Sequence, residues 1–341
     1  MRHFFVIAFW VWVTSVSAQQ ATSSFLRFGL HDGRMLAKAY LKPFGEILGT
    51  NLNSGWYSSA GIHKLGGFDI TVVGTYAIVP NDGEFYDVQK LAASFENFTF
   101  NAGSPTAAAP TVAGKLLPGQ QMPSLAFVKP GDGSIPIPAL PNGNDFDVML
   151  SPAIQGAVGL PFNTDLIARF MPTVSYDDFG KANLFGAGIK HSLWDDLPFL
   201  NRIPFMRLSV VAAYSHFSSD VELDNLSFTA DDGNLMRVSS DALMARLVGG
   251  VDFPVVSVYA GLGYGYAKSS FDLEGTYNIT DFNDSGPYST SVKDPFSLSY
   301  AKSNIDFNVG IRVKLMFLIL HADYTVSEYQ ALTAGVGVHF R

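Results

Sequence analysis

Histidine is the residue type of this chain with the widest chemical use, and its positions form no catalytic or metal-binding pattern. His191, His216, His321 and His339 lack the short, regular spacing by which metal ligands are recognised. A serine hydrolase needs a serine, a histidine and an orienting polar group in one place, and His321 and His339, with Ser or Thr nearby, come closest. There is no cysteine, so disulfides and thiolate metal sites are excluded. We therefore expect no enzyme activity, no cofactor and no bound metal.

A glycine-rich run at residues 261–265, Gly-Leu-Gly-Tyr-Gly, has only a superficial similarity to a nucleotide-binding loop. The dinucleotide fingerprint requires a helix directly after the glycines, whereas this run lies inside an alternating strand pattern. Small residues on the inner side of a curved barrel explain it better. The formal net charge of −8 argues against a nucleic-acid partner, which would require a basic surface.

A larger set of charged residues falls on the polar face of the strand-like segments described below. If the alternation holds, these residues project into the lumen of a barrel: Arg169, Lys190, Arg207, Arg246, Arg312, Lys314, Asp69, Asp306, Asp323 and His321. One interpretation is a pore lining or an anion-attracting constriction. The other, which we favour, is a network of paired charges that closes a narrow lumen, because small barrels often fill themselves with side chains.

The elements that must position these residues are strands, and the C-terminal one is the clearest. Leu332, Ala334, Val336, Val338 and Phe340 alternate with small or polar residues, so one face is apolar and the other is not. The same period of two recurs upstream in residues 68–79, 148–160, 166–175, 185–190, 206–215, 243–251, 256–266, 305–314 and 318–325.

The connections between these segments favour an antiparallel transmembrane β-barrel over a soluble β-sandwich. Short turns near residues 161–163, 252–254 and 314–316 alternate with long loops at 80–145, 219–239 and 275–295. This asymmetry is typical of outer-membrane barrels, whereas a sandwich would expose a charged face. We count ten strands, twelve if residues 94–100 and 121–128 form a further barrel hairpin, and fourteen at most. Aromatic girdles are predicted from Trp56, Tyr57, Trp194, Tyr264 and Tyr266.

Export is indicated by the first residues and by the composition. Arg2 and His3 precede an apolar stretch at residues 4–13 and small residues ending at Ala18, as in a cleaved signal peptide. The stretch is shorter than the about 20 residues of a spanning helix. Only 15% of residues are charged, against about 25% in soluble domains. We expect a signal peptide at residues 1–18 and location in the cell outer membrane.

Residues 19–66 form a leader ahead of the barrel, which we expect to occupy residues 67–341 with a long outer loop at 101–144. An amphipathic helix is predicted, with Asp32 as its cap and Pro43 bending or ending it. Its apolar stripe recurs at helical spacing: Met35, Leu36, Ala39, Tyr40, Phe44, Ile47 and Leu48. We expect it to plug the lumen rather than to lie at the periplasmic rim or on the membrane surface.

Two stretches give the chain a family resemblance. Residues 52–60 with His63, Lys64 and residues 67–69, and then residues 184–192, resemble a group of uncharacterised outer-membrane barrels. That group looks like a shorter relative of the long-chain fatty-acid transporter barrels, in which an N-terminal segment plugs the lumen. The resemblance, with an apolar helix inside a polar-lined barrel, implies passive uptake or binding of a small hydrophobic molecule. The alternative is a closed structural or surface-interaction barrel without transport. The expected partners are outer-membrane lipid, the barrel-insertion machinery and a small hydrophobic ligand.

Overall fold

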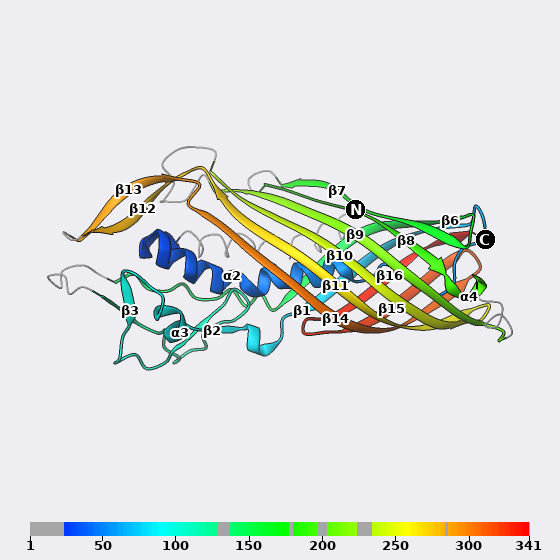
Figure 1. The fold of residues 1–341 in the computed structure, drawn as a ribbon, viewed down its shortest axis with the longest axis horizontal. Helices are drawn as coiled ribbons and strands as arrows, with labels where there is room; N and C mark the ends of the chain where they lie inside the picture. The colour runs from blue at the N-terminus through cyan, green and yellow to red at the C-terminus, as the bar shows by residue number, and fades with distance from the viewer. Residues whose placement is uncertain are drawn as a thin grey trace.

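The computed structural model describes residues 24–128, 137–176, 180–196, 203–223, 234–283 and 286–340. The predicted signal peptide at residues 1–18 lies outside the described residues and stays a prediction. Within them, ten antiparallel strands close into one barrel in the order β1-β16-β15-β14-β11-β10-β9-β8-β7-β6 (Figure 1). Their bounds are Phe68–Ile78 (β1), Val148–Leu160 (β6), Thr164–Tyr176 (β7), Gly180–Ser192 (β8), Met206–Glu222 (β9), Leu235–Asp252 (β10), Val256–Glu274 (β11), Phe296–Leu315 (β14), Leu318–Val326 (β15) and Gln330–Phe340 (β16).

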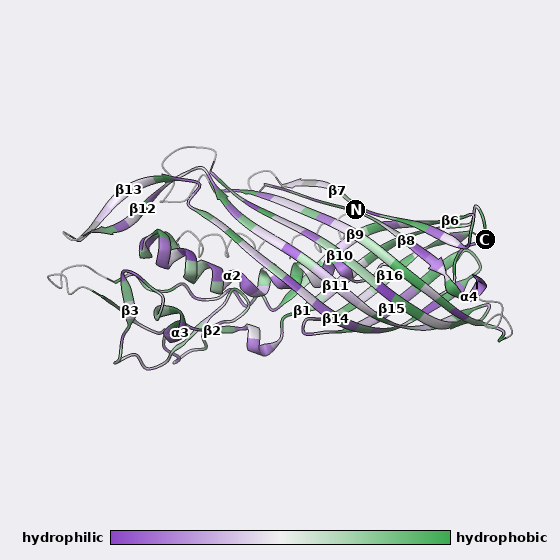
Figure 2. Ribbon diagram, viewed as in Figure 1, coloured by the Kyte–Doolittle hydropathy of each residue, from purple (hydrophilic) through white to green (hydrophobic). Residues whose placement is uncertain are grey.

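The barrel is apolar outside and polar inside, the reverse of a soluble protein. Successive side chains of a strand point to opposite faces, so Ile70 and Val72 of β1 are exposed while Thr71 and Thr75 are buried. Figure 2 shows the resulting alternation of hydrophobic and hydrophilic residues along the strands. The barrel is closed by β1 and β16, which pair from Phe68 with Phe340 to Ile78 with Gln330. A closed ladder with an apolar exterior is what a strand protein needs in lipid.

The two ends of the barrel differ, as the predicted connections require. At the turn end, β6–β7, β10–β11 and β14–β15 are joined by two or three residues, and the C-terminal strand ends there (Figure 1). Three turn residues have positive φ: Phe162, Asn163 and Met316. At the loop end lie residues 79–128 and 137–147, the end of β9 at Glu222, the start of β10 at Leu235, and residues 275–283 and 286–295 between β11 and β14.

The strands are of unequal length, which builds a wall beyond the barrel. β9, β10, β11 and β14 have 17 to 20 residues, and the other barrel strands have 9 to 13. About 9–11 residues suffice to cross a membrane. The surplus therefore extends past the loop end as a sheet on one side, which we call the strand wall. It continues into a hairpin of β12 (Thr276–Asn283) and β13 (Gly286–Lys293).

Residues 79–128 and 137–147 fold into a compact unit opposite the strand wall, here called the outer lobe (Figure 1). It contains β2 (Phe85–Asp87), α3 (Val88–Ala92), β3 (Phe98–Phe100), β4 (Ala108–Pro110) and β5 (Leu125–Phe127). The predicted pairing of residues 94–100 with 121–128 exists, because β3 pairs with β5. Their membership of the barrel was wrong: strands of three residues cannot cross a membrane. The strand count is ten rather than twelve or fourteen.

The leader contains the 3₁₀ turn η1 (Phe25–Phe28) and the helix α2 (Leu30–Asn53). One expectation for this helix was wrong. Asp32 does not cap it, since the helix begins at Leu30 after Gly29. Pro43 does not end it, because the tertiary packing of this buried segment outweighs one lost backbone hydrogen bond. No helix in the described residues is long and apolar enough to cross a membrane.

Candidate functional site

The leader follows the whole length of the barrel interior. Its helix starts between the outer lobe and the strand wall and enters the lumen, where the side chain of Asn53 donates to the carbonyl of Tyr266 at 3.4 Å (Figure 1). Residues 54–67, here called the lumenal linker, continue to the turn end. There the N–H of Gly66 donates to the carbonyl of Gly159, and Gly67 donates to Lys64 in a tight turn that leads into β1.

The outer half of α2 is part of one large apolar core. Of the predicted stripe, Leu36, Tyr40, Phe44, Ile47 and Leu48 are buried, whereas Met35 and Ala39 are half-buried. Further buried positions, such as Leu41 and Gly45, make the apolar surface wider than the stripe, because the helix packs on two sides.

Aromatic contacts join this half of the helix to both of its neighbours. The ring centre of Phe44 lies 5.2 Å from the ring centre of Phe146 of the outer lobe and 5.4 Å from that of Phe271 of the strand wall. Burial raises the pKa of the Tyr40 phenol well above its usual value, so the hydroxyl stays protonated and donates to Asn142. The helix is therefore the common core element of the parts beyond the barrel.

Asp32 fixes the outer lobe to the helix. Its carboxylate is fully buried and accepts three backbone N–H donors, from Glu96 at 2.8 Å, Asn97 at 2.9 Å and Phe98 at 3.1 Å. Charge-assisted hydrogen bonds of this kind are among the strongest in proteins. The residue predicted as a helix cap instead serves a loop 64 residues away in sequence.

In the middle of the lumen, Trp56 is clamped between a cation and a glycine surface. It is 1% exposed, its indole N–H donates to Leu52, and the Arg169 guanidinium lies 4.3 Å from its ring centre. Arg169 also donates to Gln155 and to the Ser54 carbonyl. On the wall behind, a Cβ added to Gly186 would lie 2.8 Å from the indole, so only glycine leaves room for it.

Tyr57 makes the next contact toward the turn end. Its hydroxyl donates to Asn308 at 2.6 Å and lies 3.4 Å from the Arg246 guanidinium. Arg246 forms a buried ion pair with Asp306 at 2.6 Å. Gly261 faces the tyrosine, and an added Cβ would lie 2.4 Å from the hydroxyl. Part of the glycine-rich run at 261–265 is thus the surface against which the leader packs.

The lumen ends in a charged cluster around His63. Its ring nitrogens lie 3.0 Å from Asp165 Oδ2 and 3.2 Å from Asp69 Oδ2. Lys190 pairs with Asp165 at 3.1 Å, and Arg312 lies 3.7 Å from Asp69 and donates to Ser59. These contacts tie the last part of the lumenal linker to three barrel strands, β1, β7 and β14.

His63 and Asp69, together with His339 of β16, are near enough to one another to hold a metal ion. The Arg312 guanidinium, however, lies 3.3 Å from His339 Nδ1 and beside Asp69. A fixed positive charge among the ligands opposes a divalent cation. The cluster is better described as an ion-pair network.

The structure brings most of the predicted lumen residues together. Those buried inside the barrel are Arg169, Lys190, Arg246, Arg312, Asp69, Asp306, Asp323 and His321. Arg207 and Lys314 are half-exposed at the turn end. Sequence reasoning missed His63, Asp165, Gln155 and Asn308, and it placed Trp56 and Tyr57 wrongly in an outer girdle. Trp194 is also buried, whereas Tyr264 and Tyr266 do lie on the outer face.

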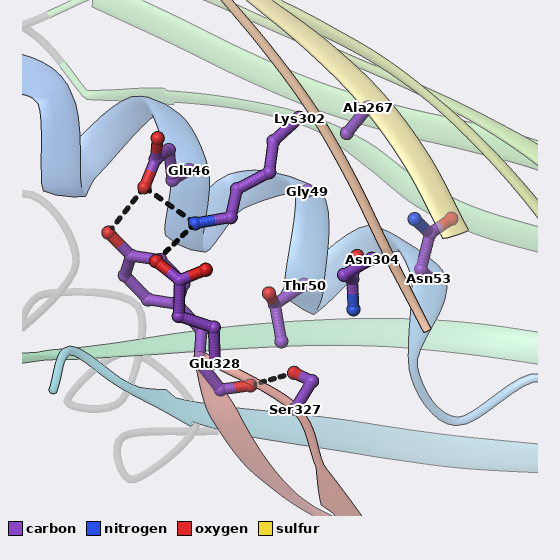
Figure 3. Close-up of a pocket in the computed structure, with 10 residues that line it drawn as sticks. Glu46, Gly49, Thr50, Asn53, Ala267, Lys302, Asn304, Ser327 and Glu328 are labelled. Carbon is purple, nitrogen blue, oxygen red and sulfur yellow. Dashed lines mark hydrogen bonds and ion pairs between the residues drawn. The ribbon is translucent and has the colours of Figure 1, made fainter. Parts of the chain in front are cut away.

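At the loop end, a second polar group joins the helix to the barrel rim. Glu46 of α2 accepts from Lys302 at 2.9 Å and from Tyr329 at 2.8 Å, and Lys302 also pairs with Glu328 (Figure 3). Beside them a cavity of about 10 Å³ is lined by Gly49, Asn53 and Asn304 among others. That volume accommodates one water molecule rather than a ligand.

Comparison with known proteins identifies one family. The family described as "Family of unknown function (DUF6588)" matches residues 1–340. No curated protein matches the chain at a significant level.

Several solved structures are similar at low identity. The translocator domain of the autotransporter NalP from Neisseria meningitidis is 13% identical, with 82% of this chain and 89% of that chain covered and a TM-score of 0.32. The outer membrane protease OmpT from Escherichia coli is 10% identical, with 83% and 99% covered and a TM-score of 0.33. The toluene transporter TbuX from Ralstonia pickettii is 5% identical, with 88% and 99% covered and a TM-score of 0.25. These likenesses assign no activity or ligand to this chain, and the similarity to fatty-acid transporters stays a prediction.

Proposed function

The chain belongs to the DUF6588 family of unknown function, and we propose that it is an outer-membrane β-barrel closed by its own leader. The closed barrel holds the outer lobe at the cell surface. The turn end then faces the periplasm and the loop end faces the outside, as in other outer-membrane barrels. In this proposal the barrel is an anchor and the outer lobe is the part that meets the surroundings.

One observation carries the proposal: the leader fills the lumen, and hydrogen bonds hold both ends of the lumenal linker to the barrel strands. Trp56 is 1% exposed and Tyr57 is 4% exposed, although both lie in a channel that would be wet if it were open. Arg246 with Asp306 and Lys190 with Asp165 pair instead of lining a free pathway. A small barrel filled in this way is a packed core.

Uptake of a small hydrophobic molecule, the function predicted from the sequence, has less support. That function requires an apolar route between the helix and the wall. The apolar residues of α2 pack against the outer lobe and the strand wall instead, as the contacts of Phe44 with Phe146 and Phe271 illustrate. The cavity beside Glu46 and Lys302 is lined mainly by polar and charged residue types and has room for one water only.

Swelling of proteoliposomes in an isotonic solution of a small sugar tests the proposal. Liposomes with the full chain are expected to swell no faster than protein-free liposomes. Liposomes with a variant lacking residues 24–63 are expected to swell quickly. A variant lacking the hairpin of residues 276–293 is the control, because it loses outer contacts and leaves the lumenal linker in place. Rapid swelling with the folded full chain would rule out a closed barrel.

A further inference from the structure

We infer that the leader enters the barrel from the outside, so that the chain at Ser24 lies on the extracellular side and passes down the lumen to the periplasmic end before β1 begins. This inference rests on the orientation given under the proposed function, and it adds the location of the N-terminal part of the exported protein.

The first described residues contact parts that lie beyond the barrel. Phe28 of η1 contacts Phe98 of the outer lobe, with ring centres 5.4 Å apart. An added Cβ on Gly29 would lie 3.5 Å from Phe282 of the hairpin β12–β13. Both partners belong to the segments farthest from the turn end (Figure 1).

The direction of the leader follows from its successive partners along β14. Near its start, the helix has Arg34 donating to the carbonyl of Pro295, just before β14. Lower down, Glu46 pairs with Lys302, and in the lumenal linker Ser59 meets Arg312. Since β14 runs from the loop end to the turn end, this order gives the leader the same direction.

β1 runs in the opposite direction, so the leader and β1 lie antiparallel with their connection at the turn end. The tight turn at Lys64 and Gly67 reverses the chain. The seam between β1 and β16 then closes with eleven residue pairs.

Labelling of single cysteines on intact cells with a membrane-impermeant maleimide tests the inference, and the absence of native cysteine makes the background clean. His31→Cys reports the start of α2, where the side chain is 45% exposed. Lys90→Cys, 84% exposed, reports the outer lobe, and Met316→Cys, 87% exposed, reports the turn end. If His31→Cys does not fold, Lys42→Cys, 63% exposed on the same helix, replaces it.

We expect the cysteines at 31 and 90 to be labelled on intact cells, and the cysteine at 316 only after the outer membrane is permeabilised. Labelling at 90 but not at 31 before permeabilisation would overturn the inference and leave the proposed orientation intact. Labelling at 316 on intact cells would overturn the orientation and, with it, the proposed function.

Discussion

Arg246→Met is expected to lower the free energy of unfolding of the barrel by about 3–5 kcal/mol, the cost of breaking a buried ion pair from one side. Asp306 is 4% exposed and pairs with Arg246 at 2.6 Å, so the substitution leaves its carboxylate buried without a counter-ion. Tyr57 loses the guanidinium beside its hydroxyl as well. Denaturant unfolding in detergent micelles, followed by the heat-modifiable migration of the folded barrel, measures the change.

The double variant Arg246→Met with Asp306→Leu is the matched control. It removes both charges and retains much of their volume, and replacing a whole buried pair is often neutral or stabilising. We expect the double variant to regain most of the stability that the single variant loses. Equal losses in the two variants would mean that packing of the side chains, rather than their pairing, holds this part of the lumen together.

Trp56→Ala is expected to cost about 3–5 kcal/mol of unfolding free energy, the range for truncating a fully buried large aromatic residue. The cavity left in the lumen has Gly186 and Gly188 on one side, which have no side chains to fill it. Arg169 also loses the ring over which its guanidinium lies. The same unfolding measurement applies.

Trp56→Phe separates packing from the remaining contacts of the indole. It keeps an aromatic ring for Arg169 but loses the N–H that donates to Leu52 at 2.9 Å. We expect a clearly smaller loss for phenylalanine than for alanine. An alanine variant as stable as the parent would show that residue 56 is not packed inside the barrel.

The fold followed from the sequence where the signal is local. The period of two in residues 332–340 and its repeats arises because neighbouring strand residues face lipid and lumen in turn. Turn lengths are also local, and residues 161–163 form the tight turn that was predicted. Ten strands were predicted, and a count of twelve stayed open because β3 and β5 have the residue types of strands. These two segments are too short to cross a membrane.

The interior of the site could be predicted only in part, because its partners are far apart in sequence. The charged residues of the lumen were found from the polar face, but their pairing across strands, such as Arg246 with Asp306, has no local signal. Asp32 was predicted to cap its own helix, since no neighbouring residue indicates that the backbone N–H groups of Glu96 and Phe98 donate to it.

Inward-facing glycines of the barrel strands are a sequence signal for where the leader packs. Gly186, Gly188 and Gly261 lie on the inward face at positions where a side chain would collide with Trp56 or Tyr57. Small inward residues in a barrel can therefore mark where a separate segment packs. Combined with the aromatic pair in the lumenal linker, they would have placed Trp56 and Tyr57 inside the lumen instead of in a girdle.

The most direct test of a lumen filled by its own leader is the accessibility of Trp56 to a small aqueous quencher. The chain has four tryptophans, two of them within residues 1–18, so Trp194→Phe protein beginning at Gln19 retains only Trp56. In the folded barrel, acrylamide is expected to quench its fluorescence several times less strongly than in the unfolded chain. Equal quenching in the folded and unfolded protein would contradict a leader packed in a closed lumen.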